Sequence, residues 1–422
     1  MQRTTRQCGV RGRVLLFAGL VSLLVPVQVG AADSLSSACA ADAERGAFET
    51  LPKPAQACLL RERGTQANYE GRYSDAEETW QALRELTPES GAAALGEIET
   101  AWWRLMLDEG ATRNDATILR ASEEAIALAD ARLAEDPADI DALYEKGAAL
   151  FNRARLHGVR GSYLKAGNEG EKGRKLLERV IEVDPERTDS RYSLGLYTYY
   201  TDVAPDVVRW MSWLWFVPKG DRDGGLRNLE IVRASGGLHA PGAEFILMNV
   251  NTYHAPMDLP GALEAGRDLH ARYPGNALFH SELVEVMLKM GLYEEAIETA
   301  RSLETSEPSE AEAAVRPQLA RILRAQAVLL SGRTEEAGEI LEPMDAERSA
   351  LPVWGGAWLY LVRGQVHDAR GERTAAKQEY SRVLALEGAR FNPRAALIAE
   401  AGLKEPFEAA SYRELPMVSA GR

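Results

Sequence analysis

The sequence predicts an all-α protein built as a solenoid of about eight short helical hairpins. Apolar residues recur at spacings of three and four along most of the chain, which is the periodicity of helices that bury one face. The strand-like alternation and Asn-Gly turns that mark β-hairpins are essentially missing. Prolines close successive units, because proline cannot continue a helix interior. These prolines are Pro88, Pro137, Pro185, Pro274 and Pro308.

The clearest unit spans residues 59–88. Small residues stand where two paired helices would touch, and large apolar residues fill the space between them. The positions that carry the pattern are Gly64, Ala67, Gly71, Tyr73, Ala76, Trp80, Leu83 and Pro88. The same order recurs at 276–308 and twice more before residue 388. The matching residues are Gly291, Tyr293, Ala296, Ala300, Leu303 and Pro308, then Gly332, Ala337 and Leu341, then Gly364, Gly371, Ala376, Tyr380 and Val383.

This spacing resembles the tetratricopeptide repeat, a helical hairpin of 34 residues, and the chain is similar to secreted bacterial proteins of that family. A single hairpin cannot bury its apolar face alone, so the hairpins are expected to stack on one another. The resemblance covers residues 57 to about 388. It implies a right-handed superhelix with a concave groove, lined by the first helix of each pair.

Between residues 90 and 275 the repeats are longer but still paired. The predicted pairs are 91–108 with 115–137, 139–157 with 170–185, 188–201 with 221–235, and 241–254 with 260–274. Residues 157–170 are rich in glycine and predict a loop longer than the usual repeat turn. Residues 389–422 are expected to form a C-terminal helix and a tail.

Residues 1–31 predict a secretory signal peptide that is cleaved near Ala31. Four arginines, Arg3, Arg6, Arg11 and Arg13, precede an apolar run at 14–29, and small residues follow it. The run is short for a membrane span, although an uncleaved segment that anchors the chain to the inner membrane is the alternative. We therefore expect a periplasmic protein with an extended segment over residues 32–56.

The chain is acidic, with a formal net charge of −14. Removing the four arginines of the signal peptide takes this charge to −18. We expect no nucleic-acid partner, since phosphate binding needs a basic footprint. Arg153, Arg155 and Arg160 form a small basic cluster, which we interpret as part of a solvated face.

Cys39 and Cys58 remain after Cys8 leaves with the signal peptide. Two cysteines in an exported chain predict one disulfide, with two buried thiols as the alternative. The bond would tie the N-terminal segment to the first helix and contribute on the order of 3 kcal/mol.

Residues 203–218 form an insertion rich in aromatic residues. Its large rings are Trp210, Trp213, Trp215 and Phe216. The segment predicts either an extra helix whose rings are core, or an exposed patch that docks a partner or a membrane surface. It is too short to span a bilayer.

The sequence predicts no catalytic, cofactor-binding or metal site. None of the six histidines lies at metal-ligand spacing from another histidine or a cysteine, and no Gly-x-Ser-x-Gly elbow is present. Paired glutamates recur at the starts of second helices, where the helix dipole favours negative charge. These pairs are Glu77-Glu78, Glu123-Glu124, Glu294-Glu295 and Glu335-Glu336.

The tetratricopeptide resemblance implies a groove that binds protein or peptide partners. Mapped onto the family, the inner face carries Arg61, Thr65, Asn68, Tyr69, Glu285, Lys289, Gln326, Gln365 and Asp368. We therefore expect an exported, non-catalytic scaffold. The alternatives are an enzyme or ligand carrier with a pocket beneath the Trp-rich insertion, and a peripheral, membrane-associated assembly factor.

Overall fold

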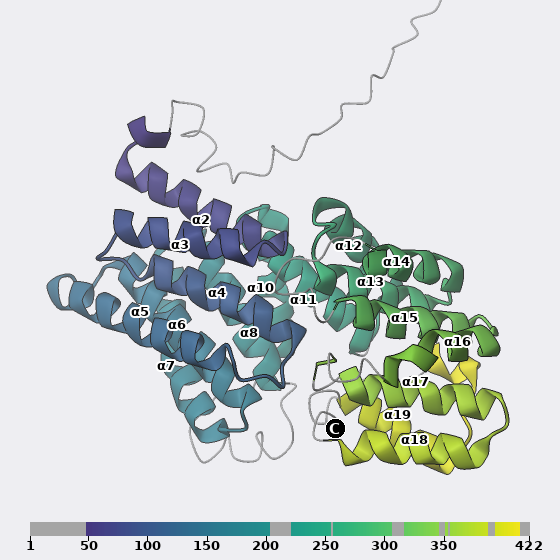
Figure 1. The fold of residues 1–422 in the computed structure, drawn as a ribbon. Coiled ribbons are helices and arrows are strands. Elements are labelled where there is room, and N and C mark those ends of the chain that lie inside the picture. Colours follow the sequence, from purple (N-terminus) through teal and green to yellow (C-terminus); the bar gives the residue numbers. More distant parts are fainter. Residues whose placement is uncertain are drawn as a thin grey trace, which may run out of the picture. The chain divides into compact units, whose positions relative to one another are not determined.

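The computed structural model describes residues 48–202, 221–254, 256–305, 316–345, 351–352, 355–386 and 393–413. These residues form 17 α-helices and three short 3-10 helices, and they contain no strand. Consecutive helices pack against each other along the chain, from α2 to α19 (Figure 1). The all-α prediction is confirmed. None of the described helices is long and apolar enough to cross a membrane.

The helices form eight consecutive hairpins, as the sequence predicts. The first four are α2 (Lys53–Tyr69) with α3 (Tyr73–Leu86), α4 (Ala92–Leu107) with α5 (Asp115–Glu135), α6 (Ile140–Val159) with α7 (Tyr163–Val183), and α8 (Thr188–Asp202) with α10 (Arg222–Ser235). The other four are α11 (Ala240–Tyr253) with α12 (Leu259–Arg272), α13 (Ala277–Met290) with α14 (Tyr293–Thr305), α15 (Arg316–Leu330) with α16 (Thr334–Leu341), and α17 (Gly355–Ala369) with α18 (Arg373–Ala385). A single helix, α19 (Pro393–Lys404), follows them, and the short helices are η1 (Phe48–Thr50), η2 (Glu342–Asp345) and η5 (Ala409–Arg413).

The first helix begins at Lys53, before the start at residue 57 that the repeat pattern gives. Pro54 lies in its first turn, where proline is tolerated because that backbone N–H has no helical partner. The prolines at 52 and 54 therefore mark a helix start as well as the end of the preceding segment.

The expected long loop at 157–170 is wrong. Helix α6 continues to Val159 and α7 already begins at Tyr163, so the turn holds only three residues. Gly161 closes this turn with a φ of 75°, a left-handed conformation that glycine adopts readily. Gly167 and Gly170 lie inside α7 instead of in a loop. Gly173 lies further along the same helix, and a Cβ there would lie 2.8 Å from the carbonyl oxygen of Gly147, so this glycine allows α6 and α7 to approach closely.

The aromatic residue of a second helix packs between two first helices. A Cβ at Gly64 of α2 or at Gly96 of α4 would lie 2.3 Å from the Trp80 ring of α3. The Trp80 indole N–H donates to the Thr100 hydroxyl, at 2.9 Å. The first hairpin is therefore fixed to the second by a large ring that fits against glycine, which explains the glycine–aromatic spacing in the clearest repeat unit.

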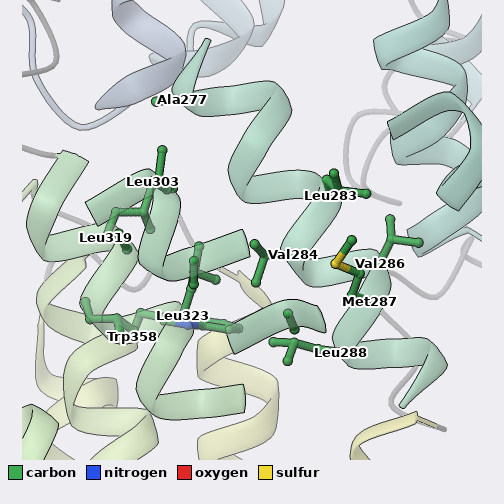
Figure 2. Close-up of a cluster of buried hydrophobic side chains, with 14 of the residues drawn as sticks. Ala277, Leu283, Val284, Val286, Met287, Leu288, Leu303, Leu319, Leu323 and Trp358 are labelled. Carbon is green, nitrogen blue, oxygen red and sulfur yellow. The ribbon is translucent and has the colours of Figure 1, made fainter. Parts of the chain in front are cut away.

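Helix α13 is covered on almost every side. Eleven of its 14 residues are buried, and the apolar ones among them share one hydrophobic cluster with residues of α14, α15 and α17 (Figure 2). Its apolar neighbours in that cluster include Leu303, Leu319, Leu323 and Trp358.

The first hairpin also contacts a distant part of the chain. The Asn276 side-chain amide donates to the backbone carbonyl of Tyr69 at 3.0 Å, across a separation of 207 residues. The Tyr69 ring lies 5.5 Å from the ring of Tyr273 and 6.4 Å from that of Phe279, and its hydroxyl donates to the carbonyl of Leu238. The end of α2 therefore packs against the connection between α12 and α13.

Candidate functional site: a cavity lined by the first helices

A cavity of about 530 Å³ lies on the side of the first five hairpins that their first helices form. Helices α2, α4, α6, α8 and α11 all contribute to its lining. Much of the wall is aromatic or aliphatic, and it includes Trp102, Trp103, Phe151, Tyr192, Phe245 and Ile246. Binding sites for small ligands and chain segments combine such walls with a few polar groups.

One arginine of α6, Arg155, presents its charge beside an aromatic ring. Its guanidinium carbon lies 3.8 Å from the centre of the Trp102 ring, and one of its nitrogens lies 3.9 Å from the Met106 sulfur. Within the described residues Arg155 makes no ion pair, although the charge of Glu109 lies close enough to interact with it. The stacking holds the guanidinium in place while its N–H groups remain available for a ligand.

A second charged group connects α2, α6 and the start of α8. Asp189 lies 3.0 Å from the Nε of Arg187 and 3.7 Å from an Nη of Arg61. Arg187 also pairs with Asp141, at 2.6 Å, and its guanidinium carbon lies 4.7 Å from the centre of the Tyr144 ring. These charges largely compensate one another.

Glu99 of α4 supplies a carboxyl group to the cavity. The Thr65 hydroxyl donates to it at 3.1 Å. Burial raises the pKa of Glu99 to about 7, against smaller opposing effects of Thr65, Trp103 and the charge of Arg61. Near neutral pH this carboxyl is therefore a mixture of the acid and the carboxylate, and it can donate or accept a hydrogen bond.

His239 lies flat against Tyr192 in the cavity wall. The two rings are 5.0 Å apart and inclined by 6°. Burial lowers the pKa of His239 to about 4, with Asp189 acting against this effect and Arg61 adding to it. The imidazole is therefore neutral at pH 7 and acts as part of the aromatic wall.

The structure brings together three of the four N-terminal residues predicted for the inner face. Arg61, Thr65 and Tyr69 all line the cavity. Asn68 faces the interior of the hairpin, where its side-chain oxygen accepts a hydrogen bond from the Thr100 hydroxyl at 2.9 Å. It is completely buried and supports the packing of α2 on α4.

The five predicted residues of the C-terminal half are buried. Gln326 donates to Gln365 at 2.9 Å, and Asp368 accepts from Arg373, the Tyr380 hydroxyl and the backbone N–H of Phe407. Their predicted partner-binding role stays a prediction. The five residues whose side chains are buried in this way are Glu285, Lys289, Gln326, Gln365 and Asp368.

The C-terminal segment explains part of this burial. Arg394 of α19 pairs with Glu285 of α13 at 2.7 Å. The Tyr412 hydroxyl of η5 donates to the same carboxylate at 3.0 Å. The chain's own C-terminal residues therefore bind the Glu285 carboxylate of α13, at a position where the family resemblance predicts a partner.

Two further predictions concern residues that the structure does not describe. The rings of Trp210, Trp213, Trp215 and Phe216 lie outside the described residues. So does Cys39, and the Cys39–Cys58 disulfide stays a prediction. Cys58 itself lies in α2 and contributes to the cavity wall.

The recurrent glutamates join helices of neighbouring hairpins. Glu77 pairs with Arg104. Glu124 lies in the middle of α5, not at the helix start where the sequence predicted it, and it pairs with Arg84 at 2.9 Å. Glu294 and Glu335 make similar pairs with Arg333 and Arg370. Among the described residues, no group of three or more His, Cys, Asp or Glu side chains is arranged to hold a metal ion.

The interpretation of Arg153, Arg155 and Arg160 as one solvated face is wrong. Arg153 pairs with Glu169, and Arg160 forms a bidentate pair with Asp115, whereas Arg155 faces the cavity. The sequence analysis did not identify Arg155, Glu99 or Trp102 as site residues. Their place on first helices was the signal that could have identified them.

Comparison with known proteins gives matches in structure alone. No family model matches the sequence, and no curated protein matches it. A tetratricopeptide repeat protein from Parabacteroides merdae is 14% identical, with 81% of this chain and 98% of that chain covered and a TM-score of 0.30. The human IFIT1 dimer with m7Gppp-AAAA is 14% identical, with coverages of 84% and 93% and a TM-score of 0.36. Naa15/Naa10 bound to HypK-THB is 14% identical, with coverages of 85% and 67% and a TM-score of 0.27.

At these TM-scores the matches carry no argument about function. The fold follows from the chain itself, through its eight hairpins, its turn glycines and its rings packed against glycine. In fold, the described chain is a tetratricopeptide-like solenoid.

Proposed function

We propose that the protein is a non-catalytic binding module that holds a short segment of a partner protein in the cavity of its first five hairpins. One observation carries this proposal. The first helices of these hairpins surround a cavity, whereas the predicted inner-face residues of the later hairpins are buried within the chain.

The chemistry of the wall supports a segment of mixed character. Aromatic side chains such as Trp103, Tyr144 and Phe245 would bury apolar groups of the partner. Arg155 and Glu99 would bind its polar groups, and the volume of about 530 Å³ lies within the usual range of ligand pockets. A few partner residues would enter the cavity, and the rest of the segment would lie outside it.

We also propose that the protein acts after export. The arginine-rich start, the apolar run and the small residues near Ala31 support a signal peptide. The partner would then be another exported protein. N-terminal sequencing of the secreted chain should begin near Ala32, and an intact Met1 on a protein confined to the cytoplasm would contradict export.

Site-specific photo-crosslinking tests the binding function. A benzoylphenylalanine at Asn152, which lines the cavity, should crosslink a defined partner in living cells. The same residue at Gln378, on the exposed side of α18, is the matched control. The purified partner should then bind the wild-type chain, with a loss of tenfold or more in Arg155→Ala, whose arginine lines the cavity, and no loss in Arg301→Ala, whose arginine is exposed on α14. Equal crosslinking at both positions, or equal binding by both variants, would refute the proposal.

A further inference from the structure

Among the arginines that line the cavity, Arg155 differs in having no carboxylate paired with it in the described residues. Four arginines line the cavity. Three of them face carboxylates, because Arg132 pairs with Asp139 and Glu145, and both Arg61 and Arg187 lie within 4 Å of Asp189. Arg155 pairs with no carboxylate in the part of the chain that the structure describes, since Glu109, whose charge interacts with it, makes no ion pair with it. It is therefore the cavity arginine whose charge is left for a ligand.

The surroundings of Arg155 are apolar. The Trp102 ring and the Met106 sulfur contact its guanidinium, and Phe151, Tyr192 and Leu196 line the same cavity. A charge beside such groups is poorly solvated, so an anionic group brought to it gains more than it would at an exposed arginine. The planar guanidinium matches a carboxylate through two parallel hydrogen bonds.

We infer that the cavity is a binding site for a small organic acid that has one carboxylate and a compact apolar or aromatic body. The carboxylate would pair with Arg155, and the body would lie among Trp103, Leu196 and Phe245. This inference goes beyond the proposed function, since it concerns a free small molecule and does not require a partner protein.

Two features favour a singly charged acid. A dianion would need a second uncompensated cation beside Arg155, whereas Arg61 already lies 3.7 Å from Asp189. Lys53, the other lining cation, lies at the start of α2, while Arg155 lies against Trp102 and Met106 of α4. Glu99 stands in the same wall, and burial raises its pKa to about 7, so it offers a hydrogen bond to a hydroxyl or amide of the ligand. A cationic ligand would meet the charge of Arg155, which disfavours amines.

Matched probes test the charge requirement directly. Isothermal titration calorimetry on the full exported chain would compare 2-naphthoate with 2-naphthamide, which has nearly the same shape but no charge. Decanoate would extend the comparison to a linear acid. We expect one naphthoate per chain and an affinity at least tenfold higher than that for naphthamide. No saturable binding of either acid at millimolar concentration would overturn the inference.

Variants assign the preference to Arg155. Arg155→Gln should abolish the tenfold preference for naphthoate, Arg155→Lys should retain part of it, and Arg301→Gln on the exposed side of α14 should change nothing. Asn152→Trp, which places a large ring inside the cavity, should abolish binding while Arg155 is intact. Circular dichroism of each variant checks the fold.

The outcomes separate this inference from the proposed function. An unchanged preference for naphthoate in Arg155→Gln would refute the role of Arg155. Unchanged binding in folded Asn152→Trp would show that the acid binds elsewhere. Crosslinking of a protein at residue 152 without acid binding would refute only the small-molecule site, and acid binding without crosslinking would refute only the partner-protein function.

Discussion

The ion pair between Arg394 and Glu285 should hold the C-terminal segment on α13. Its nitrogen–oxygen distance is 2.7 Å, and the two side chains are only 8% and 9% exposed. The Tyr412 hydroxyl accepts from Arg394 at 2.9 Å and donates to Glu285 at 3.0 Å. The rings of Tyr253 and Trp358 lie 5.5 and 5.1 Å from the guanidinium carbon. Both charges are therefore removed from water and depend on each other.

Arg394→Met should destabilise the C-terminal half by about 3–5 kcal/mol, because it leaves the Glu285 carboxylate buried with its main partner gone. Glu285→Gln should also be destabilising, because Arg394 then loses its counter-charge. The double variant R394M/E285Q contains neither charge. It should cost clearly less than the sum of the single variants, and the difference measures the coupling between the two side chains.

Amide hydrogen exchange followed by mass spectrometry is the suitable assay, since a repeat array can open in parts. A loss of 3 kcal/mol corresponds to about a hundredfold faster exchange. Peptides of α13 and α19 should show this change, and peptides of α4 and α5 should not. The matched control is the double variant Arg301→Met with Glu298→Gln, which removes an exposed ion pair on α14. It should change the free energy of opening, derived from the exchange rates, by less than about 1 kcal/mol. Strictly additive single variants, or a loss below 1 kcal/mol in Arg394→Met, would refute the reasoning.

Three further predictions follow from the N-terminal half. Trp80→Ala should cost about 3–5 kcal/mol in urea denaturation, because it empties the space between Gly64 and Gly96, and a normal midpoint would contradict this packing. The free energy of unfolding should fall as the pH rises from about 4.5 to about 7, because burial raises the pKa values of Glu99 and Glu282 to about 7 and both carboxyls must then ionise. Glu99→Gln should reduce the loss between pH 5 and pH 8 by up to about 3 kcal/mol, while the share of Glu282 persists; an equal loss in the wild type and the variant, measured by urea denaturation at both pH values, would show that Glu99 titrates normally. The unreduced exported chain should be two hydrogens lighter than the reduced chain if Cys39 and Cys58 pair, whereas two thiols that alkylate without reductant would exclude the bond.

The sequence was sufficient to predict the hairpins because their signals are local. Glycine, a ring and a small residue at fixed spacing determine how a second helix meets its neighbours, as Trp80 does with Gly64 and Gly96. Glycine has two uses, however, and the sequence does not separate them. Gly161 makes a turn with positive φ, while Gly170 lies inside α7, where a Cβ would lie 2.7 Å from the Tyr197 ring. The long loop was predicted because both were interpreted as loop residues.

The remaining features depend on contacts between distant residues. Nothing in the spacing of the first repeat indicates that Asn276 binds the carbonyl of Tyr69, 207 residues away. The burial of Glu285 likewise depends on Arg394 and Tyr412, which lie more than 100 residues beyond it. Repeat patterns describe nearest neighbours, so they cannot predict where an array contacts itself.

These contacts decide what the inner face does in each half of the array. The same repeat register places Arg61 and Thr65 on α2 and Glu285 on α13. Arg61 and Thr65 line a cavity, whereas Glu285 is neutralised by Arg394 and removed from solvent. A charged residue at an inner-face position therefore indicates a binding role only where no other segment of the chain supplies its partner. The repeat mapping selected Glu285 and did not select Arg155. By this criterion, however, Arg155 is the stronger candidate for ligand binding.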